Sequence, residues 1–519
     1  MPAVMQYLYR CKKYKMNIVE TDICIVGSGM GGGTLALKLA EKGMQPLLIE
    51  AGNLEQDSGV LPTTFSGQSF GLERSRAVEV GGGTNLWHGV VAPLDARDFK
   101  GGTTYTGWPI DYEKMLPYWA SALNFLGFEN PALTHFEGLD SRLKKHANDI
   151  GYNDTQIYPK LFRVMGQPRR LKGDIAAAAE AGRLTLMSDT IALECIADAP
   201  GGRIRELIVG RAGARAIIRA KRFVISAGAL ETPRLLQNSR TFGPAGLGNV
   251  TGNVGKYLMD HPMAFLGKIK FRRPTRAPLF SDIRETRRNR FRIGLIPKEK
   301  TALLNSNLYL RPAIPGATPD AENRILVSLI AVRKMRDLSL HHVRNLLANP
   351  KVLYRIVANR YVLPIRYHAA DLFFVTEQTP TPESRVSLCP DQVDPYGYPV
   401  AKVNWTVSDA DLINVGKFIE ILIADGLKSN QYAWDEMPSL DKWRKSYTSA
   451  AHHLGTARMA KDHRDGVVDS DLKIHGVENA WVCDGSVFPT GGNANPSLTI
   501  CALALRLSEH LSKVSRTDD

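Results

Sequence analysis

The sequence predicts an α/β protein that joins a parallel-sheet, nucleotide-binding part to a second part built on a mainly antiparallel sheet plus helices. Residues 21–52 show the pattern of a strand, a glycine-rich turn, a helix and a second strand. Residues 371–404 instead show strands separated by Pro, Asp and Gly turns. A chain of 519 residues is too long for one simple core, so two domains or one large discontinuous domain are expected.

The unit at residues 21–52 carries a phosphate-binding pattern. An apolar run at 23–26 predicts a buried strand, and G-x-G-x-x-G follows at 27–32 where the chain turns into a helix. Such glycines permit a tight turn, close approach of backbone N–H groups to a pyrophosphate, and packing of the helix. Glu50 ends the second strand, where a carboxylate can accept the ribose hydroxyls of an adenine dinucleotide. The unit predicts a Rossmann-type domain for NAD or FAD, with an ordinary glycine turn as the alternative.

Two further stretches suggest contact with the same ligand. Residues 81–89, GGGTNLWHG, combine three consecutive glycines with Trp and His, which favours a ligand-contacting loop over a merely flexible one. The strand at 222–228 ends in Ser, Ala and Gly, and small residues there suit close approach of a cofactor. A helix opened by Pro109 is interpreted as packing, and a last helix is predicted over 496–511.

The basic character of the chain is local. The formal net charge is +14, and residues 268–366 hold 22 Lys and Arg against 6 Asp and Glu, so the remainder is nearly balanced. This distribution favours a local surface role and argues against a nucleic-acid partner. Residues 338–363 show helical apolar spacing, with Lys351 and Arg355 on another face. Such helices can lie on an anionic membrane, dock a partner, form an oligomer contact or pack on their own domain.

Cysteine usage and hydropathy indicate a cytoplasmic protein. The six cysteines are scattered and form no C-x-x-C, so they are interpreted as reduced core residues, and no metal site is predicted. The first 20 residues are basic but lack the apolar region of a secretory signal. No run reaches the ~20 apolar residues of a membrane span, so no transmembrane segment is expected.

Several motifs, in one order along the chain, resemble those of the glucose-methanol-choline (GMC) family of FAD oxidoreductases. They are VGSGMGGG with Glu50, GGGTNLWHG, AGALETPRLLQNS, VGKYLMDHP, HHLGTARM and VCDGSVFPTGGNANPSLTICALALRL. Residues 263–445 match only through EQTPTPESRVSL. Within the family, the T-N-L-W stretch and the chain length are most similar to sugar oxidoreductases, such as pyranose oxidases and bacterial glycoside oxidases.

The resemblance implies FAD rather than NAD and a division of the chain into two domains. A discontinuous FAD-binding domain would comprise residues 16–262 and 446–519, with parts of 90–165 contributing to the substrate side. Residues 263–445 would form the substrate-binding domain. This domain would carry the basic segment 268–366, which is expected to be helical.

The resemblance also assigns contacts to FAD. Where pyranose oxidases have a histidine bonded to FAD, this sequence aligns Leu86, with His88 nearby but displaced, so non-covalent FAD is expected. The first glycine pattern would contact the pyrophosphate, Glu50 the adenosine ribose, and Asp484 would close the site. The full set of expected FAD contacts is Gly27, Ser28, Gly29, Met30, Gly31, Gly32, Glu50, Ala51, Gly82, Gly83, Thr84, Asn85, Trp87, Ala227, Gly228, Asp484, Gly485, Asn495 and Pro496.

Oxidation of an alcohol at a flavin needs a base, because hydride leaves carbon while the hydroxyl loses its proton. A histidine has a pKa near operating pH and suits this role. His452, in H-x-x-G-T, matches the family's base, and Asn495 matches its side-chain partner. The Asn495 amide can donate a hydrogen to the same oxygen as negative charge builds. The interpretation of His453 and His261 is a structural or supporting role.

Sugar recognition would need polar groups from the second domain, since discrimination of hydroxyls depends on satisfied buried hydrogen bonds. Glu377 and Gln378, at a strand end, are candidates together with His453, although Glu377 could simply pair with Arg385. The predicted function is oxidation of a CH–OH group, such as a secondary hydroxyl of a sugar or glycoside, with oxygen or another electron acceptor. The alternatives are the same chemistry on an aliphatic, aromatic or sterol alcohol, and a non-catalytic flavin-binding scaffold that docks through its basic helices.

Overall fold

A computed structural model of the chain covers both predicted parts. It describes residues 18–55, 61–66, 69–72, 75–102, 105–133, 138, 155–198, 202–275, 283–313, 324–325, 328–329, 332, 338–361, 367–426 and 432–517. Cys11 and the basic N-terminal stretch lie outside the described residues.

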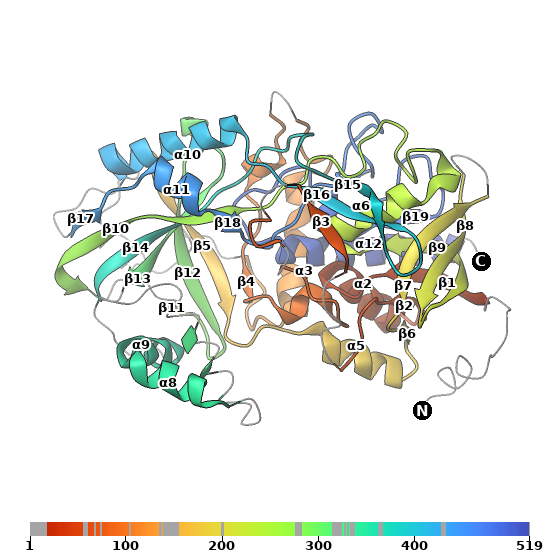
Figure 1. Cartoon of the computed structure of the whole chain (residues 1–519), viewed down its shortest axis with the longest axis horizontal. Coiled ribbons are helices and arrows are strands. Elements are labelled where there is room, and N and C mark those ends of the chain that lie inside the picture. The colour runs from red at the N-terminus through yellow and green to blue at the C-terminus, as the bar shows by residue number, and fades with distance from the viewer. Residues whose placement is uncertain are drawn as a thin grey trace.

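A seven-stranded sheet forms the nucleotide-binding part, at the right of Figure 1. Its order is β6-β2-β1-β9-β8-β7, and β19 pairs in parallel with β9. The strands are β1 (Ile18–Val26), β2 (Leu47–Ile49), β6 (Thr185–Met187), β7 (Ile191–Ala197), β8 (Ile204–Arg211), β9 (Ala214–Ile225) and β19 (Ala480–Val482). The last four residues of β1 are buried, as is typical of a central parallel strand covered on both faces. The predicted strand, turn, helix and strand at 21–52 is confirmed.

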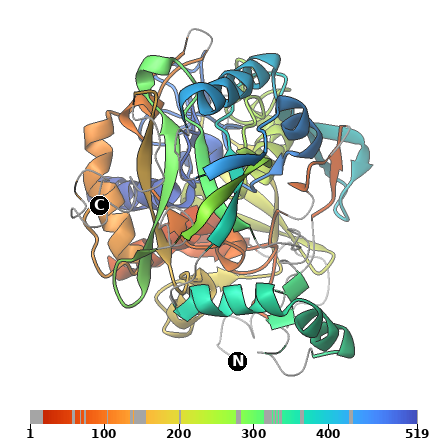
Figure 2. The same ribbon diagram turned by 90° about the vertical axis from the view of Figure 1, so that its left-hand side faces the viewer.

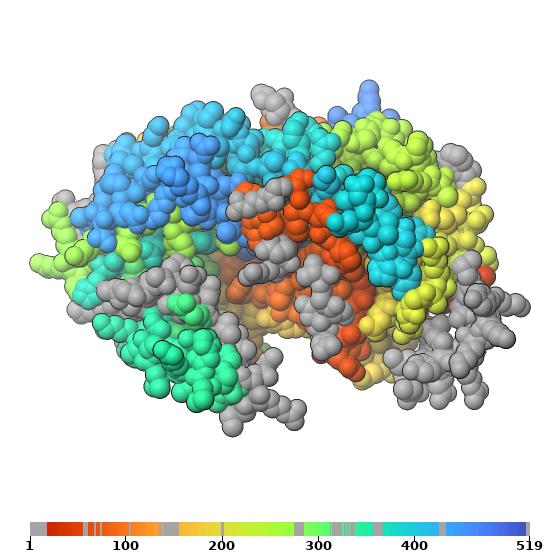
Figure 3. All heavy atoms as spheres, viewed as in Figure 1, coloured from red at the N-terminus to blue at the C-terminus, as the bar shows by residue number. Residues whose placement is uncertain are grey.

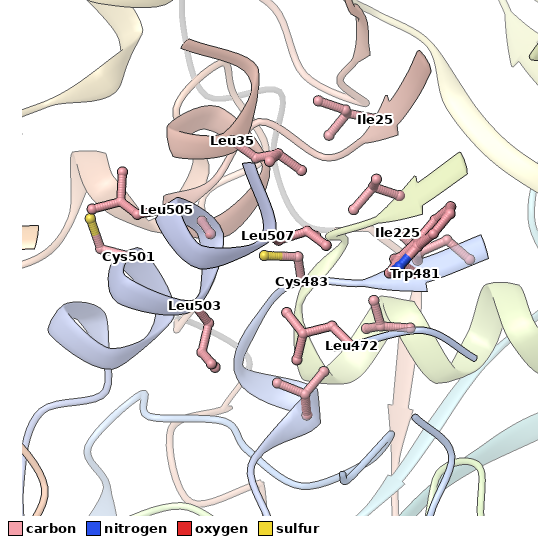
Figure 4. Packing of buried hydrophobic residues seen from close by; sticks show 14 of the residues in the cluster. Ile25, Leu35, Ile225, Leu472, Trp481, Cys483, Cys501, Leu503, Leu505 and Leu507 are labelled. Atoms are coloured by element: carbon pink, nitrogen blue, oxygen red, sulfur yellow. The ribbon is translucent and has the colours of Figure 1, made fainter. Parts of the chain in front are cut away.

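Helices from opposite ends of the chain pack on this sheet. α2 (Met30–Glu41) packs against α12 (Ser497–Thr517), which in turn packs against α3 (Tyr112–Leu126). Figure 4 shows Leu35 of α2 and Leu507 of α12 in the same core as Ile25 of β1 and Ile225 of β9. The C-terminal segment therefore completes the fold that the first glycine pattern begins.

Two predicted helix boundaries shift. α3 begins at Tyr112 rather than at Pro109, because Asp111 is still extended, with φ −69° and ψ 141°. α12 continues to Thr517, beyond the predicted end at 511. Other helices are α5 (Leu171–Glu180), α6 (Gly228–Asn238), α8 (Leu340–Ala348), α9 (Pro350–Tyr361), α10 (Asp409–Ile421) and α11 (Leu440–Ser446).

A nine-stranded antiparallel sheet forms the second part, at the left of Figure 1 and towards the viewer in Figure 2. Its order is β17-β10-β14-β13-β12-β5-β4, with β11 on β12 and β18 on β10. The strands are β4 (Val90–Val91), β5 (Ile157–Met165), β10 (Pro262–Thr275), β11 (Ile283–Arg284), β12 (Asn289–Pro297), β13 (Asn307–Ala313), β14 (Tyr367–Val375), β17 (Tyr432–Glu436) and β18 (Thr448–Ser449). Phe374 of β14 stacks on Phe418 of α10, with ring centroids 4.7 Å apart, so α10 covers one face of the sheet.

The prediction that the basic segment 268–366 is helical is wrong for its first part. Ile269 and Phe271 are buried while Lys270 between them is exposed, so the segment starts with the period-two pattern of β10. Strands β11, β12 and β13 follow. Among the described residues of the later part, α8 and α9 supply the expected basic helices.

The strands predicted at 371–404 divide between two sheets. The first belongs to β14, whereas β15 (Arg385–Val393) and β16 (Pro399–Asn404) pair with β3 (Thr63–Phe65) in a three-stranded sheet. α6 packs against β15 and β16, next to the nucleotide-binding part. Both the nine-stranded and the three-stranded sheet therefore combine strands from the two sides of the proposed domain boundary at 262. The division into two domains stays a prediction.

Three properties of the described chain concern its cysteines, its helices and possible metal sites. The described cysteines are all free and buried: Cys24, Cys195, Cys389, Cys483 and Cys501. Within the described ranges, no helix combines the length and the apolar character that crossing a membrane requires. No group of three or more His, Cys, Asp and Glu side chains in the same ranges could hold a metal ion.

Candidate active site

One cavity of about 560 Å³ runs along the carboxyl ends of the parallel strands. Its described lining comes from residues 26–90, 190–238 and 450–500. Every expected FAD contact except Gly32 and Asn85 lies on its wall, together with His452 and His453. Two ends of the chain thus meet in one cavity of the kind that a dinucleotide needs.

The first glycine pattern divides its glycines between packing and ligand approach. A Cβ atom at Gly32 would lie 2.0 Å from the Gly27 carbonyl oxygen, so only glycine fits where α2 crosses the turn. A Cβ atom at Gly29 would meet no protein atom within 4 Å, and Gly29 lies on the cavity wall. The N-terminus of α2 follows at Met30, where backbone N–H groups favour a phosphate.

Glu50 is buried at the end of β2 and holds the turn in place. Its Oε2 accepts hydrogen bonds from Ser28 N at 2.9 Å and Ser28 Oγ at 2.6 Å, and its Oε1 accepts from Gly52 N at 3.0 Å. Burial raises the pKa of Glu50, while these hydrogen bonds oppose the rise. Ser28 Oγ also accepts from Gly81 N at 2.9 Å. The two glycine stretches are therefore joined through one carboxylate and one hydroxyl.

The second glycine loop presents its backbone and three larger side chains to the cavity. Leu86, Trp87 and His88 all lie on the wall. Trp87 Nε1 donates to the Arg169 carbonyl at 2.9 Å, which fixes the indole. Asn85 lies off the wall, because its amide donates to the Val80 carbonyl at 2.9 Å and closes the loop.

Asp484 joins the C-terminal segment to the start of α6. Its Oδ2 accepts from Gly228 N at 2.8 Å and from Thr232 Oγ1 at 2.7 Å, and its Oδ1 accepts from Ser486 N at 2.8 Å. Asp484, Gly228 and Gly485 line the cavity. A Cβ atom at Gly31 would lie 1.9 Å from the Cys483 carbonyl oxygen, so the C-terminal segment that carries Asp484 also packs directly against the first glycine pattern.

His452 and Asn495 meet on the cavity wall. His452 Nε2 lies 3.0 Å from Asn495 Nδ2, and His452 Nδ1 lies 2.8 Å from Nδ1 of His261. Burial, followed by the neighbouring histidines, lowers the pKa of His452 well below 6.5. Ala451, just before it, has φ +62°, a left-handed conformation that is uncommon for a non-glycine residue. The pair has the composition of a neutral base with an adjacent hydrogen-bond donor.

Asp260 organises the backbone around this pair. Its Oδ1 accepts from the backbone N–H groups of His261 at 2.6 Å and His452 at 3.1 Å, and its Oδ2 accepts from Ser449 Oγ at 2.6 Å. His453 lies on the same wall, but its Nε2 contacts Ser75 Oγ at 2.9 Å rather than Asn495. Burial lowers the pKa of His453 to about 3. His453 therefore ties Ser75 to the segment that carries His452.

Glu377 and Gln378 do not lie on the wall of this cavity. Glu377 accepts from Asn305 N at 2.7 Å and from Gly492 N at 2.9 Å, and burial together with Asp98 raises its pKa to about 8. Gln378 Oε1 accepts from Asp260 N at 3.0 Å and from Trp405 Nε1 at 2.8 Å. These contacts give both side chains a structural role, and their contact with substrate stays a prediction.

The structure adds wall residues that the sequence did not indicate. Arg76 donates to Glu231 at 2.6 Å, and both residues line the cavity. Thr190 to Leu193, at the start of β7, and Asn238 of α6 also line it. In the sequence, only the charged residues inside the apolar stretch ALETPRLL could have indicated Glu231 as a cavity residue.

Comparison with known proteins agrees with this geometry. Residues 380–504 match the family model described as GMC oxidoreductase. The chain is 25% identical to 2-methyl-1,2-propanediol dehydrogenase of Mycolicibacterium austroafricanum, over 95% of each chain. It is 23% identical to the fructose dehydrogenase large subunit of Gluconobacter japonicus, over 95% of this chain and 97% of that one.

A solved structure shares the fold. Pyridoxine 4-oxidase from Mesorbium loti has a TM-score of 0.61 at 18% identity, covering 95% of this chain and 99% of that chain. The family match and the relatives, together with this fold, indicate an FAD-dependent oxidoreductase. Residues 380–504 match the GMC oxidoreductase family, and the chain over most of its length is similar to the dehydrogenases named above.

Proposed function

We propose that the protein oxidises a CH–OH group with His452 as the base and Asn495 as its hydrogen-bonding partner. The observation that carries this proposal is the 3.0 Å contact between His452 Nε2 and Asn495 Nδ2 on the cavity wall. Bound FAD supplies the hydride acceptor. A substrate oxygen seated between the two side chains would give its proton to Nε2 and accept a hydrogen from the Asn495 amide.

The proposed substrate is a sugar or glycoside, oxidised at a secondary hydroxyl. Its support is the likeness to the fructose dehydrogenase large subunit and to a C-glycoside 3-oxidase of Microbacterium trichothecenolyticum, which is 29% identical over 25% of this chain. The second candidate is a non-sugar alcohol, favoured by the full-length likeness to a diol dehydrogenase.

Anaerobic flavin bleaching distinguishes these substrates. Purified protein would be mixed without oxygen with sugars, glycosides, diols and simple alcohols, and the loss of flavin absorbance followed. We expect sugars or glycosides to bleach the flavin faster than diols at equal concentration. Faster bleaching by diols would replace the sugar proposal, and no bleaching by any alcohol would favour a non-catalytic scaffold. Admitting air afterwards tests whether oxygen is the electron acceptor.

We predict that FAD is bound without a covalent link, since Leu86 occupies the position aligned with an attaching histidine. Acid precipitation of the purified protein should release the flavin into the supernatant, measured by its absorbance. Yellow colour that stays with the pellet would contradict this prediction. His88 would then be the first residue to replace, because it also lies on the cavity wall.

We also propose that α8 and α9 dock on an anionic lipid surface. Both helices lack acidic residues, and Arg344 and Lys351 are exposed on them. Leu340, Leu347 and Tyr354 are 90%, 76% and 59% exposed. Figure 3 shows the two helices at the lower left of the molecule, standing out from the main body. Basic and apolar side chains together match the headgroup and acyl boundary of such a surface.

Vesicle sedimentation tests the docking surface. Charge reversal of Arg344→Glu with Lys351→Glu should lower the fraction bound to phosphatidylglycerol-containing vesicles at least about tenfold, since each basic residue contributes ~1 kcal/mol near an anionic surface. The matched control is Lys417→Glu with Lys445→Glu on α10 and α11, which makes the same change in net charge. Equal binding to pure phosphatidylcholine would contradict the proposal. Loss of a dimer in the first variant, without lipid binding by the parent, would assign the helices to an oligomer contact.

A further inference from the structure

His261 is a fully buried histidine, and both of its ring nitrogens have partners. Its side chain is 1% exposed, at the residue directly before β10. Its Nε2 lies 2.8 Å from the Gly492 carbonyl oxygen, and its Nδ1 lies 2.8 Å from Nδ1 of His452. The two rings stand nearly perpendicular, at 83°, with centroids 5.0 Å apart. The residue therefore bridges a backbone carbonyl and the base.

These contacts determine where the protons lie. A carbonyl oxygen can only accept a hydrogen bond, so His261 Nε2 must carry the hydrogen that points at Gly492. A neutral imidazole carries one N–H, so His261 Nδ1 is an acceptor. His452 Nδ1 must then donate to it. His452 Nε2 is left with a free electron pair, which faces the amide of Asn495.

We propose that His261 is a positioning residue that fixes the tautomer of His452, so that Nε2 is always the nitrogen able to accept the substrate proton. This inference rests on the proposed function in one respect, the assignment of His452 as the base. It adds the device that prepares the base: a chain of hydrogen bonds from Asn495 through His452 and His261 to Gly492. In many bases a carboxylate has the orienting role.

The neighbouring charges are consistent with a neutral pair of rings. The carboxylate of Asp260 accepts hydrogen bonds from the backbone N–H groups of both histidines, so it holds their main chain rather than their rings. Burial lowers the pKa of His261 to about 4. A second cation beside the base would also oppose its protonation, because like charges at this distance repel.

The same arrangement supports the protonated base. When the substrate O–H bond breaks, the new N–H bond forms at His452 Nε2. The carbon that carries this hydroxyl gives its hydride to the flavin. The His452 Nδ1–H bond to His261 is retained and becomes charge-assisted, which strengthens it. No ring has to turn during the proton transfer.

Two substitutions separate the two contacts of His261. His261→Asn places an amide oxygen near the position of Nδ1. This oxygen can still accept a hydrogen bond from His452, but the hydrogen bond to the Gly492 carbonyl is lost. His261→Gln reaches towards Gly492 but leaves His452 Nδ1 without its acceptor. We expect anaerobic flavin reduction to slow about 10- to 100-fold in His261→Gln and much less in His261→Asn. FAD content and near-ultraviolet circular dichroism should match the parent in both variants.

A second measurement reads the tautomer directly, without turnover. Protein labelled with 15N-histidine would be examined by solid-state NMR, and the His452 signals assigned by their absence in His452→Gln. We expect a protonated Nδ1 and an unprotonated Nε2 in the parent and in His261→Asn, and a mixture of tautomers in His261→Gln. A protonated Nε2 in the parent, or an unchanged tautomer in His261→Gln, overturns the proposal.

The outcomes also separate this inference from the proposed function. If His452→Gln reduces its flavin at the parental rate while the tautomer depends on His261 as expected, His452 is not the base but the positioning relation stands. If His452→Gln is inactive and His261→Gln reacts like the parent with an unchanged tautomer, the base stands and the role of His261 is wrong.

Discussion

Replacing His452 with alanine is expected to slow anaerobic flavin reduction by roughly 10²- to 10⁴-fold while FAD stays bound. The imidazole is the group that would take the hydroxyl proton. Without it, loss of hydride would leave a protonated carbonyl, which is unfavourable. His452 is only one of many residues on the wall of the FAD cavity, so its loss leaves the cofactor contacts intact. Stopped-flow absorbance of the flavin at saturating substrate measures the effect.

The neighbours of His452 provide graded controls. Asn495→Ala should lower the rate less, since one lost donor to a developing alkoxide costs on the order of 3 kcal/mol in the transition state. His453→Ala should have a much smaller effect, because its ring contacts Ser75 instead. If His453→Ala abolishes reduction and His452→Ala does not, the second histidine is the base.

The pH dependence of the parent follows from the same burial. A base with a lowered pKa stays neutral down to lower pH, so it remains active below the 6.5 that is ordinary for histidine. The rate of flavin reduction should therefore begin to fall only below pH 6.5 as the solution is acidified. An acidic limb at or above pH 6.5 would show that His452 is more solvated in the reacting complex than in this structure.

The second large effect concerns two glycines of the first pattern. Gly32→Ala should destabilise the protein severely, by more than about 4 kcal/mol, because the new Cβ would lie 2.0 Å from the Gly27 carbonyl oxygen. Gly29→Ala should leave the FAD-free protein as stable as the parent, since a Cβ there meets nothing within 4 Å. It should weaken FAD binding at least about tenfold, because the methyl group would occupy space that a pyrophosphate needs.

Melting temperature without FAD and flavin titration separate these results. A parental melting temperature for Gly32→Ala would mean that α2 can move away from the turn. Parental FAD affinity in Gly29→Ala would mean that the pyrophosphate does not approach this glycine. Either result would revise the placement of the cofactor along the cavity.

Part of the fold and of the candidate site could be predicted from the sequence alone. The unit at 21–52 could be predicted because its signals are local. The glycine spacing, the apolar runs and the terminal acid all lie within one short stretch of the sequence. The pairing of His452 with Asn495 was predicted only through family resemblance, since 43 residues separate them and no periodicity connects them.

Other features were decided only by the tertiary structure. The contact of His261 with His452 joins residues that are 191 positions apart in the sequence. It depends on Asp260, which accepts hydrogen bonds from the backbone N–H groups of both histidines. Glu377 was a candidate for substrate contact, and that contact stays a prediction. Only the tertiary structure shows that its carboxylate accepts hydrogen bonds from the backbone N–H groups of Asn305 and Gly492. Side-chain direction and hydrogen-bond partners depend on which distant segments pack together, and a local pattern carries no information about that choice.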